Sequence, residues 1–228
     1  MGKTMRPAPE VHVEADGSFG VIVTPWGPRS STKKIVESLI DFVNTSKDDT
    51  EVTSPFQKLT CLSKAANILR AAIMLTNDVI YREENRNEYL AGSEIFAFSS
   101  QPNEFSFVQV GQPHVLLARK GFAPQLISNA MTMSLEFSNK TNLPPMPQEL
   151  LGLHSTSNLK VVTFRPMPGD TLILISRTRI PAALLSENYD VNNLDEITNL
   201  LSKDNAEEPF WAGVYEIPAF NSSVNEAA

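Results

Sequence analysis

The sequence predicts an α+β fold built as a four-layer α-β-β-α sandwich, in which two antiparallel sheets pack together and helices cover their outer faces. Two observations support this prediction. Two long amphipathic helices are expected in the first third of the chain, and a succession of apolar strands follows them. One strand, residues 172–175, has four consecutive aliphatic side chains, which is typical of a strand buried on both faces.

The first expected elements are a hairpin and a helix. Residues 10–16 alternate as a strand, Asp16-Gly17 forms the turn, and residues 19–23 return. Ser31-Thr32 is expected to cap a helix that runs to about Val43.

A second, longer helix is expected from about Pro55 to Arg82, because apolar residues repeat there at every third or fourth position. Cys61 lies inside this predicted helix, so its thiol is expected to be buried and inert.

Strands dominate the rest of the chain. Four phenylalanines are expected to fill the core from two successive strands, at positions Phe96, Phe98, Phe105 and Phe107. Residues 130–149 are rich in Pro, Asn and Met and predict a long loop, and residues 160–164 form the next strand. With 228 residues, 42% of them hydrophobic, we expect a single domain over 1–228 with frayed ends at about 1–9 and 221–228.

Five segments carry a resemblance to a known family. In chain order they are Thr24-Pro25-Trp26-Gly27-Pro28, Ala91-Gly92-Ser93-Glu94, Val110-Gly111-Gln112, Ser176-Arg177-Thr178 and Glu207-Glu208. In their order and spacing, and in the strands beside them, the chain resembles the type 2C (PPM) metal-dependent serine/threonine phosphatases over roughly Glu10 to Ile217. The resemblance implies the sandwich fold of that family, which hydrolyses phosphoesters with two Mg or Mn ions that activate a water.

The same resemblance implies metal-binding residues where this chain has others. The family carries Asp-Gly at the positions of Thr24 and Pro25, Ser-Asp-Gly at Ser176-Arg177-Thr178, and Asp-Asp or Asp-Asn at Glu207 and Glu208. Hard cations need oxygen ligands such as carboxylates, and neither a threonine hydroxyl nor a proline ring replaces a carboxylate.

Arg177 also brings a positive charge, because a guanidinium stays protonated at biological pH. At ~4 Å from a divalent ion, an effective dielectric of about 20 gives about 8 kcal/mol of repulsion. We therefore expect no metal, no cofactor and no catalytic residue at the degenerate metal positions, which are Thr24, Pro25, Arg177, Thr178, Glu207 and Glu208.

These substitutions predict a pseudophosphatase, a catalytically inactive protein of this fold that acts by binding a protein partner such as a kinase, a phosphoprotein or a regulator. Two roles are open for Arg177. Together with Arg179 it lines the old cleft and contacts a phosphorylated residue, or it pairs with a nearby acid inside the protein and fills the cleft.

Two other classes of function are also open. A weak or atypical Mn/Mg-dependent phosphoprotein phosphatase would hold one metal with Glu207 or Glu208. A structural subunit of a larger assembly would use an outer helix face or an exposed strand edge.

Composition excludes several further classes. A formal net charge of −7 argues against general nucleic-acid binding. No apolar run approaches the length of a membrane helix and no signal peptide is recognised, so no membrane association is expected. Cys61 is the only cysteine, which fits a cytoplasmic location. His12, His114 and His154 form no zinc motif, and no phosphate-binding glycine loop is present.

Overall fold

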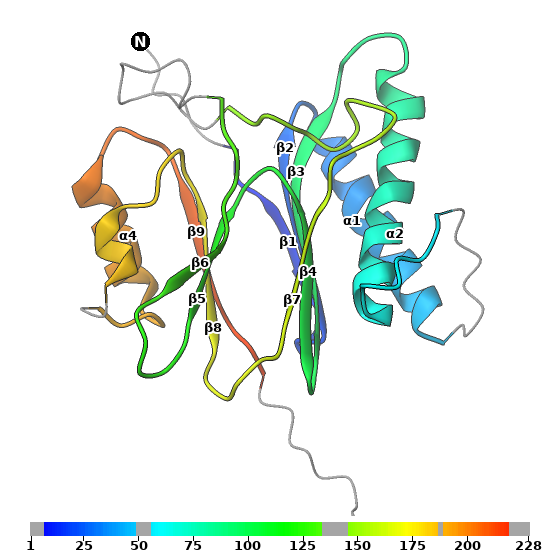
Figure 1. The fold of residues 1–228 in the computed structure, drawn as a ribbon. Helices are drawn as coiled ribbons and strands as arrows, with labels where there is room; N and C mark the ends of the chain where they lie inside the picture. Colours follow the sequence, from blue (N-terminus) through cyan, green and yellow to red (C-terminus); the bar gives the residue numbers. More distant parts are fainter. Residues whose placement is uncertain (1–6, 49–55, 134–145, 187–188, 219–228) are drawn as a thin grey trace, which may run out of the picture.

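Two antiparallel sheets face each other in the computed structural model, which describes residues 7–48, 56–133, 146–186 and 189–218 (Figure 1). The five-stranded sheet has the order β1-β2-β3-β4-β7. Its strands are Glu10–Val13 (β1), Phe19–Trp26 (β2), Gly92–Gln101 (β3), Glu104–Val110 (β4) and Lys160–Phe164 (β7).

The four-stranded sheet has the order β6-β5-β8-β9. Its strands are Gln125–Ser128 (β6), His114–Ala118 (β5), Thr171–Ser176 (β8) and Trp211–Glu216 (β9).

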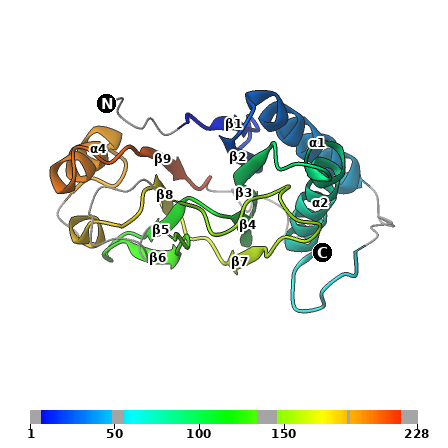
Figure 2. The ribbon, with the colours of Figure 1, turned by 90° about the horizontal axis from the view of Figure 1, so that it is seen from above.

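Helices cover the outer face of each sheet, as Figures 1 and 2 show from two directions. Helices α1 (Arg29–Asp48) and α2 (Lys64–Ile80) pack on the five-stranded sheet, and α2 continues into the π-helical turn η1 (Tyr81–Asn85). Helix α4 (Leu194–Asp204) and the short 3-10 helix η2 (Ala182–Leu185) lie against the four-stranded sheet. The predicted α-β-β-α sandwich is therefore confirmed.

Three apolar cores separate these layers. The middle core lies between the sheets and includes the four predicted phenylalanines, Phe96, Phe98, Phe105 and Phe107. Strand β8 belongs to two cores at once, because Leu172 and Leu174 enter the middle core while Ile173 and Ile175 pack towards α4. This alternation explains the continuous aliphatic run, since both faces of the strand are covered.

The predicted N-terminal hairpin is present, with β1 paired to β2 and the Glu14 amide donating to the carbonyl of Phe19. Strand β1 ends at Val13 rather than at residue 16, and β2 continues to Trp26.

Both predicted helix starts were wrong. Helix α1 begins at Arg29, directly after Pro28, and ends at Asp48 rather than Val43. Ser31 and Thr32 are therefore buried within its first turn instead of capping it. Helix α2 begins at Lys64 because the Ser63 side chain caps it, accepting from the amide of Ala66 at 3.1 Å.

The later start of α2 also changes the environment of Cys61. This residue lies in the turn before the helix and is exposed, so the prediction of a buried thiol was wrong.

Some predictions fall partly outside the described residues. These are the frayed ends, for residues 1–6 and 221–228, and the loop at 130–149, for residues 134–145. In the described part of that loop, Thr132 and Pro147 form an isolated antiparallel bridge. None of the helices in the described part of the chain has the length and apolar character needed to cross a membrane.

Candidate functional site

The candidate site lies at the end of the sandwich where β2 and β8 finish and β3 and β9 begin, uppermost in Figure 1. Antiparallel pairing brings these ends together, because Trp26 pairs with Gly92 in one sheet and Ser176 pairs with Trp211 in the other. The degenerate metal positions of the sequence therefore fall at or near one end of the molecule.

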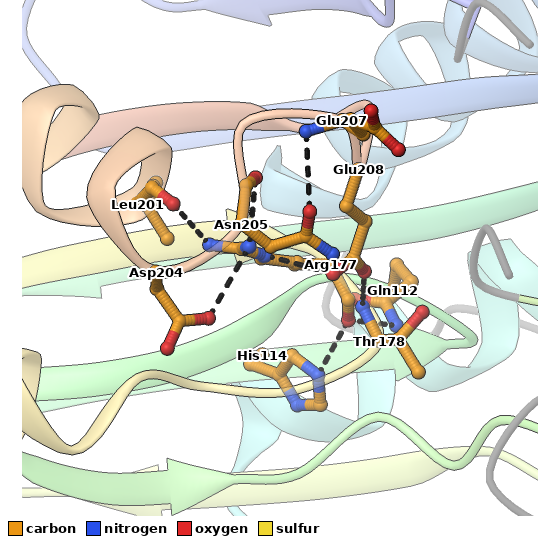
Figure 3. A network of polar contacts seen from close by, with 9 residues as sticks. All are labelled: Gln112, His114, Arg177, Thr178, Leu201, Asp204, Asn205, Glu207 and Glu208. Atoms are coloured by element: carbon orange, nitrogen blue, oxygen red, sulfur yellow. Dashed lines mark hydrogen bonds and ion pairs between the residues drawn. The ribbon is translucent and has the colours of Figure 1, made fainter. Parts of the chain in front are cut away.

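Arg177 immediately follows β8, and its side chain is fully buried. Its Nε donates to Glu208 Oε2 at 3.0 Å, its Nη1 to the carbonyl of Leu201 at 2.6 Å and its Nη2 to the carbonyl of Asn205 at 3.1 Å (Figure 3). Asp204 Oδ2 lies 3.3 Å from Nη2. All three guanidinium nitrogens are therefore engaged inside the protein.

These partners place the guanidinium at the C-terminal end of α4, on the outer side of the four-stranded sheet. Helix α4 ends at Asp204, where its last carbonyls lack helical partners and its dipole is negative. Arg177 adds a second donor to the Leu201 carbonyl, which also accepts from the Asn205 amide, and supplies a compensating charge. The Phe210 ring lies under the guanidinium, 5.9 Å from Cζ to the ring centroid.

Glu208 is also buried and makes a second contact with the end of β8. Its Oε1 accepts from the backbone amide of Thr178 at 2.7 Å, while its Oε2 accepts from Arg177. Each oxygen of this carboxylate thus already has a donor. The Arg177–Glu208 pair therefore connects the segment after α4 to the segment after β8.

The backbone carbonyl of Arg177 is held from the opposite side by two buried side chains. Gln112 Nε2 donates to it at 3.0 Å, and His114 Nε2 lies 2.8 Å away. The His114 Nδ1 accepts from the amide of Ala130 at 3.1 Å, so the proton of a neutral ring is on Nε2 and donates to Arg177. Burial lowers the pKa of His114 below its usual 6.5, which keeps the ring neutral.

The other degenerate positions do not join this network equally. Thr178 is buried and belongs to it through its amide. Thr24 and Pro25 are buried on β2 of the other sheet, opposite Glu94 and Ser93 of β3.

Glu207 and Arg179 are both exposed. Arg177 and Arg179 therefore do not line a common cleft, and the geometry fits the alternative in which Arg177 pairs internally with an acid.

Five members of this network were not identified from the sequence: Gln112, His114, Leu201, Asp204 and Asn205. Gln112 and His114 flank Pro113, and no motif connects them to a residue more than 60 positions away. No helix was predicted over residues 194–204, so Asp204 and Asn205 at its end were not identified. Their approach to Arg177 depends on the tertiary packing of α4.

The described residues do not fit a pair of divalent ions. No three carboxylate, histidine or cysteine side chains in the described ranges come together in a group that could hold a metal. At the former metal positions stand two threonine hydroxyls, a proline ring, a buried cation and two glutamates. One of these, Glu208, is already bonded to that cation, and the other, Glu207, is exposed. No hydrolytic step through a metal can be derived from this donor set.

No protein-family model matches the sequence, and no curated protein matches it significantly. Solved structures do match. The Mycobacterium tuberculosis serine/threonine phosphatase PstP/Ppp is similar with a TM-score of 0.63 and 15% identity, over 94% of each chain.

Two further solved structures are similar. The PPM Ser-Thr phosphatase MsPP from Mycobacterium smegmatis, solved with cacodylate, gives a TM-score of 0.61 and 13% identity over 95% of this chain and 97% of its own. The catalytic domain of PstP with two manganese ions gives a TM-score of 0.56 and 15% identity, over 92% of this chain and 95% of its own. The chain therefore has the fold of the PPM-type serine/threonine phosphatases.

Proposed function

We propose that this protein is a pseudophosphatase: a PPM-type scaffold that does not hydrolyse phosphoesters and acts by binding a protein partner. The observation that carries the proposal is the buried Arg177–Glu208 pair, at the position where the resemblance puts a metal-binding aspartate. A guanidinium there supplies positive charge permanently, so a divalent ion nearby would be repelled rather than bound.

Glu208 and Glu207 offer little support for a residual one-metal phosphatase. Both oxygens of Glu208 already accept hydrogen bonds, and releasing them would leave Arg177 buried without its main partner. Glu207 is exposed, and its amide bonds to the side chain of Asn205. A weak Mn/Mg-dependent phosphatase is therefore not a second proposal. It is the result that would refute the proposal in the turnover assay below.

A protein partner is supported by the surface near the same end of the sandwich. Tyr89 and Leu90 are 68% and 55% exposed, and Tyr89 makes an edge-to-face contact with the exposed His154. The side chain of Asn85 holds this surface in place by bonding to the backbone of Leu90 and of Gly152. Exposed aromatic groups on a fixed backbone are typical of interface anchors.

The partner class is a kinase, a phosphoprotein or a regulator, encountered in the cytoplasm. The net charge of −7 favours a protein over a nucleic acid, and the single, exposed Cys61 suits a reducing compartment.

Phosphoester turnover in the presence of Mn²⁺ tests the catalytic part of the proposal. We expect no release of p-nitrophenol from p-nitrophenyl phosphate above the rate of buffer with Mn²⁺, while the PstP catalytic domain serves as the positive control. Turnover that requires Mn²⁺ and disappears in the Glu207→Gln/Glu208→Gln double variant would refute the proposal and establish the residual enzyme.

A second experiment tests partner binding separately. A partner purified with the protein from its native cell should re-form a complex of defined stoichiometry from purified components. The Tyr89→Ala/Leu90→Ala double variant should weaken that complex, and the exposed-site control Leu185→Ala should not. An inert protein that forms no complex would contradict the binding role.

A further inference from the structure

A pocket of about 310 Å³ opens at the same end of the sandwich, between the end of β4, the segment after β6 and the start of β7. Strands β6 and β7 belong to different sheets and lie on the same edge of the sandwich in Figure 2. Four carboxamide side chains line the pocket together with one acid and one cation: Gln109, Asn129, Gln148, Asn158, Glu149 and Lys160. We call it the amide pocket. It lies beside the Arg177 network, to which Ala130 connects it through His114, and its volume is close to the lower end of the range for small-molecule sites, about 300–1,000 Å³.

Hydrogen bonds between distant segments fix the walls of the amide pocket. Ser128 Oγ donates to Gln109 Oε1 at 2.6 Å, and Gln109 Nε2 donates to the carbonyl of Gly111 at 2.6 Å. On the neighbouring wall, the Ala130 amide is bonded to His114. The pocket is therefore part of the folded framework, as preformed ligand sites are.

After Ala130, hydrogen bonds connect the two segments of the chain that form the rim of the amide pocket. Thr132 Oγ1 donates to the carbonyl of Met146 at 3.1 Å, and the Met133 amide donates to the same carbonyl at 2.9 Å. The segment that carries Asn129 and the segment that carries Gln148 and Glu149 are thus held together.

Lys160 is the cation of the amide pocket, and its charge is not neutralised by the described part of the chain. Its Nζ donates to the carbonyl of Asn129 at 3.0 Å, a neutral acceptor, and no described carboxylate forms an ion pair with it. Partial burial lowers the pKa of Lys160, which reflects the loss of water around the ammonium. An anion placed beside this ammonium would replace part of the electrostatic stabilisation that the lost water provided.

Glu149, the acid of the pocket, has a different role. Its Oε2 accepts from the backbone amide of Asn158 at 3.0 Å, so it is engaged with the chain rather than with Lys160. A ligand that carries both a carboxylate and an N–H group would match the cation and the acid of the pocket together. Amino-acid and peptide units have this combination.

We infer that the amide pocket binds a carboxylate-bearing amino acid or peptide unit, with Lys160 as the cationic anchor and the carboxamides of Asn129, Gln148 and Asn158 as hydrogen-bonding partners. Because the protein carries a net charge of −7, anions are repelled overall, and saturable binding of an anion requires such a local cation. The inference goes beyond the proposed function, since it holds whether or not the chain hydrolyses phosphoesters.

Two probes distinguish the possible sources of the carboxylate. N-acetylglycine presents a terminal carboxylate, as a free acylated amino acid or a chain end would. The blocked peptide acetyl-Gly-Asp-Gly-amide presents only a side-chain carboxylate. N-acetylglycinamide keeps the acetyl amide N–H and has a neutral carboxamide in place of the terminal carboxylate, so it is the neutral control. Amide chemical shifts of Gly111, Asn129 and Ala130 report binding without any activity assay.

We expect at least one charged probe to shift these amides saturably with one-to-one stoichiometry, and the neutral control not to. Lys160→Gln should weaken binding by about tenfold or more, because a charge-assisted hydrogen bond is lost. Lys203→Gln, at an exposed lysine of α4, should leave the affinity unchanged. Both lysines are exposed, so both variants should keep the melting temperature of the parent.

Three results would overturn the inference: no saturable shift with either charged probe, equal binding of the neutral control, or unchanged affinity in Lys160→Gln.

Discussion

Arg177 and Glu208 form an ion pair closed to water, with Nε 3.0 Å from Oε2 and side chains that are 0% and 5% exposed. The pair joins the end of β8 to the segment between α4 and β9. Two charges that leave water together are stable only while both remain, because the loss of one leaves the other buried and uncompensated. The site where the fold family is expected to hold metal ions is thus organised around an internal salt bridge.

Removing the cation should therefore destabilise the fold strongly. We expect Arg177→Met to lower the free energy of unfolding by about 3–5 kcal/mol, measured by urea denaturation. Changing Glu208→Leu in the same chain should recover part of the loss, since no buried charge then remains unpaired and Asp204 is 49% exposed to water. Arg82→Ala is the matched control, because its pair with Asp78 is 71% exposed at the arginine and should cost less than about 1 kcal/mol. A similar small loss for Arg177→Met would contradict the account.

His114 makes stability depend on pH in a defined direction. Its folded pKa is lowered below the unfolded value of 6.5 by burial, so between the two values the unfolded chain binds the proton more readily. Its contribution is therefore complete above pH 6.5 and is lost as the pH falls from 6.5 through the folded pKa. We expect urea midpoints of the parent to decline over that range more steeply than those of His114→Gln.

The exposed His154 provides the control for this titration. His154→Gln should follow the parent curve over the same pH range. If the urea midpoints of the parent and of His114→Gln fell equally with pH, the buried ring would not be the cause of the pH-dependent stability.

The side chain of Asn85 connects two loops beside the site by hydrogen bonds. Its buried amide donates to the carbonyls of Ala91 and Gly152 and accepts from the amides of Leu90 and Ala91. Asn85→Ala leaves several of these groups without a partner, so we expect the free energy of unfolding to fall by at least about 2 kcal/mol. Asn44→Ala, at an exposed position of α1, should change it by no more than about 0.5 kcal/mol. Equal effects at the two positions would rule out the bonding role of Asn85.

The layers of the fold could be predicted from the sequence because they depend on local apolar patterns. The run Leu172–Ile175 indicated a doubly covered strand, and the structure divides its side chains between two cores. Helix starts were less predictable. Apolar spacing continues upstream through Leu59 and Leu62, but the cap at Ser63 begins the helix at Lys64.

The candidate site could be predicted only in part. The sequence showed that Arg177 replaces an acidic position, and it left open whether the guanidinium faces a ligand or an internal acid. That choice depends on tertiary packing, because Glu208 and the C-terminal carbonyls of α4 lie 24–31 residues further along the chain. The buried contacts of Gln112 and His114 with the Arg177 carbonyl likewise follow from the pairing of β5 with β8.

The central claim is that this end of the sandwich holds an internal salt bridge in place of divalent ions. Calorimetric titration of the folded protein with Mn²⁺ tests it most directly, with the PstP catalytic domain, whose solved structure contains two manganese ions, as positive control. The account predicts no saturable heat for this chain. Saturable binding of two Mn²⁺ ions that leaves Arg177 in place would contradict it.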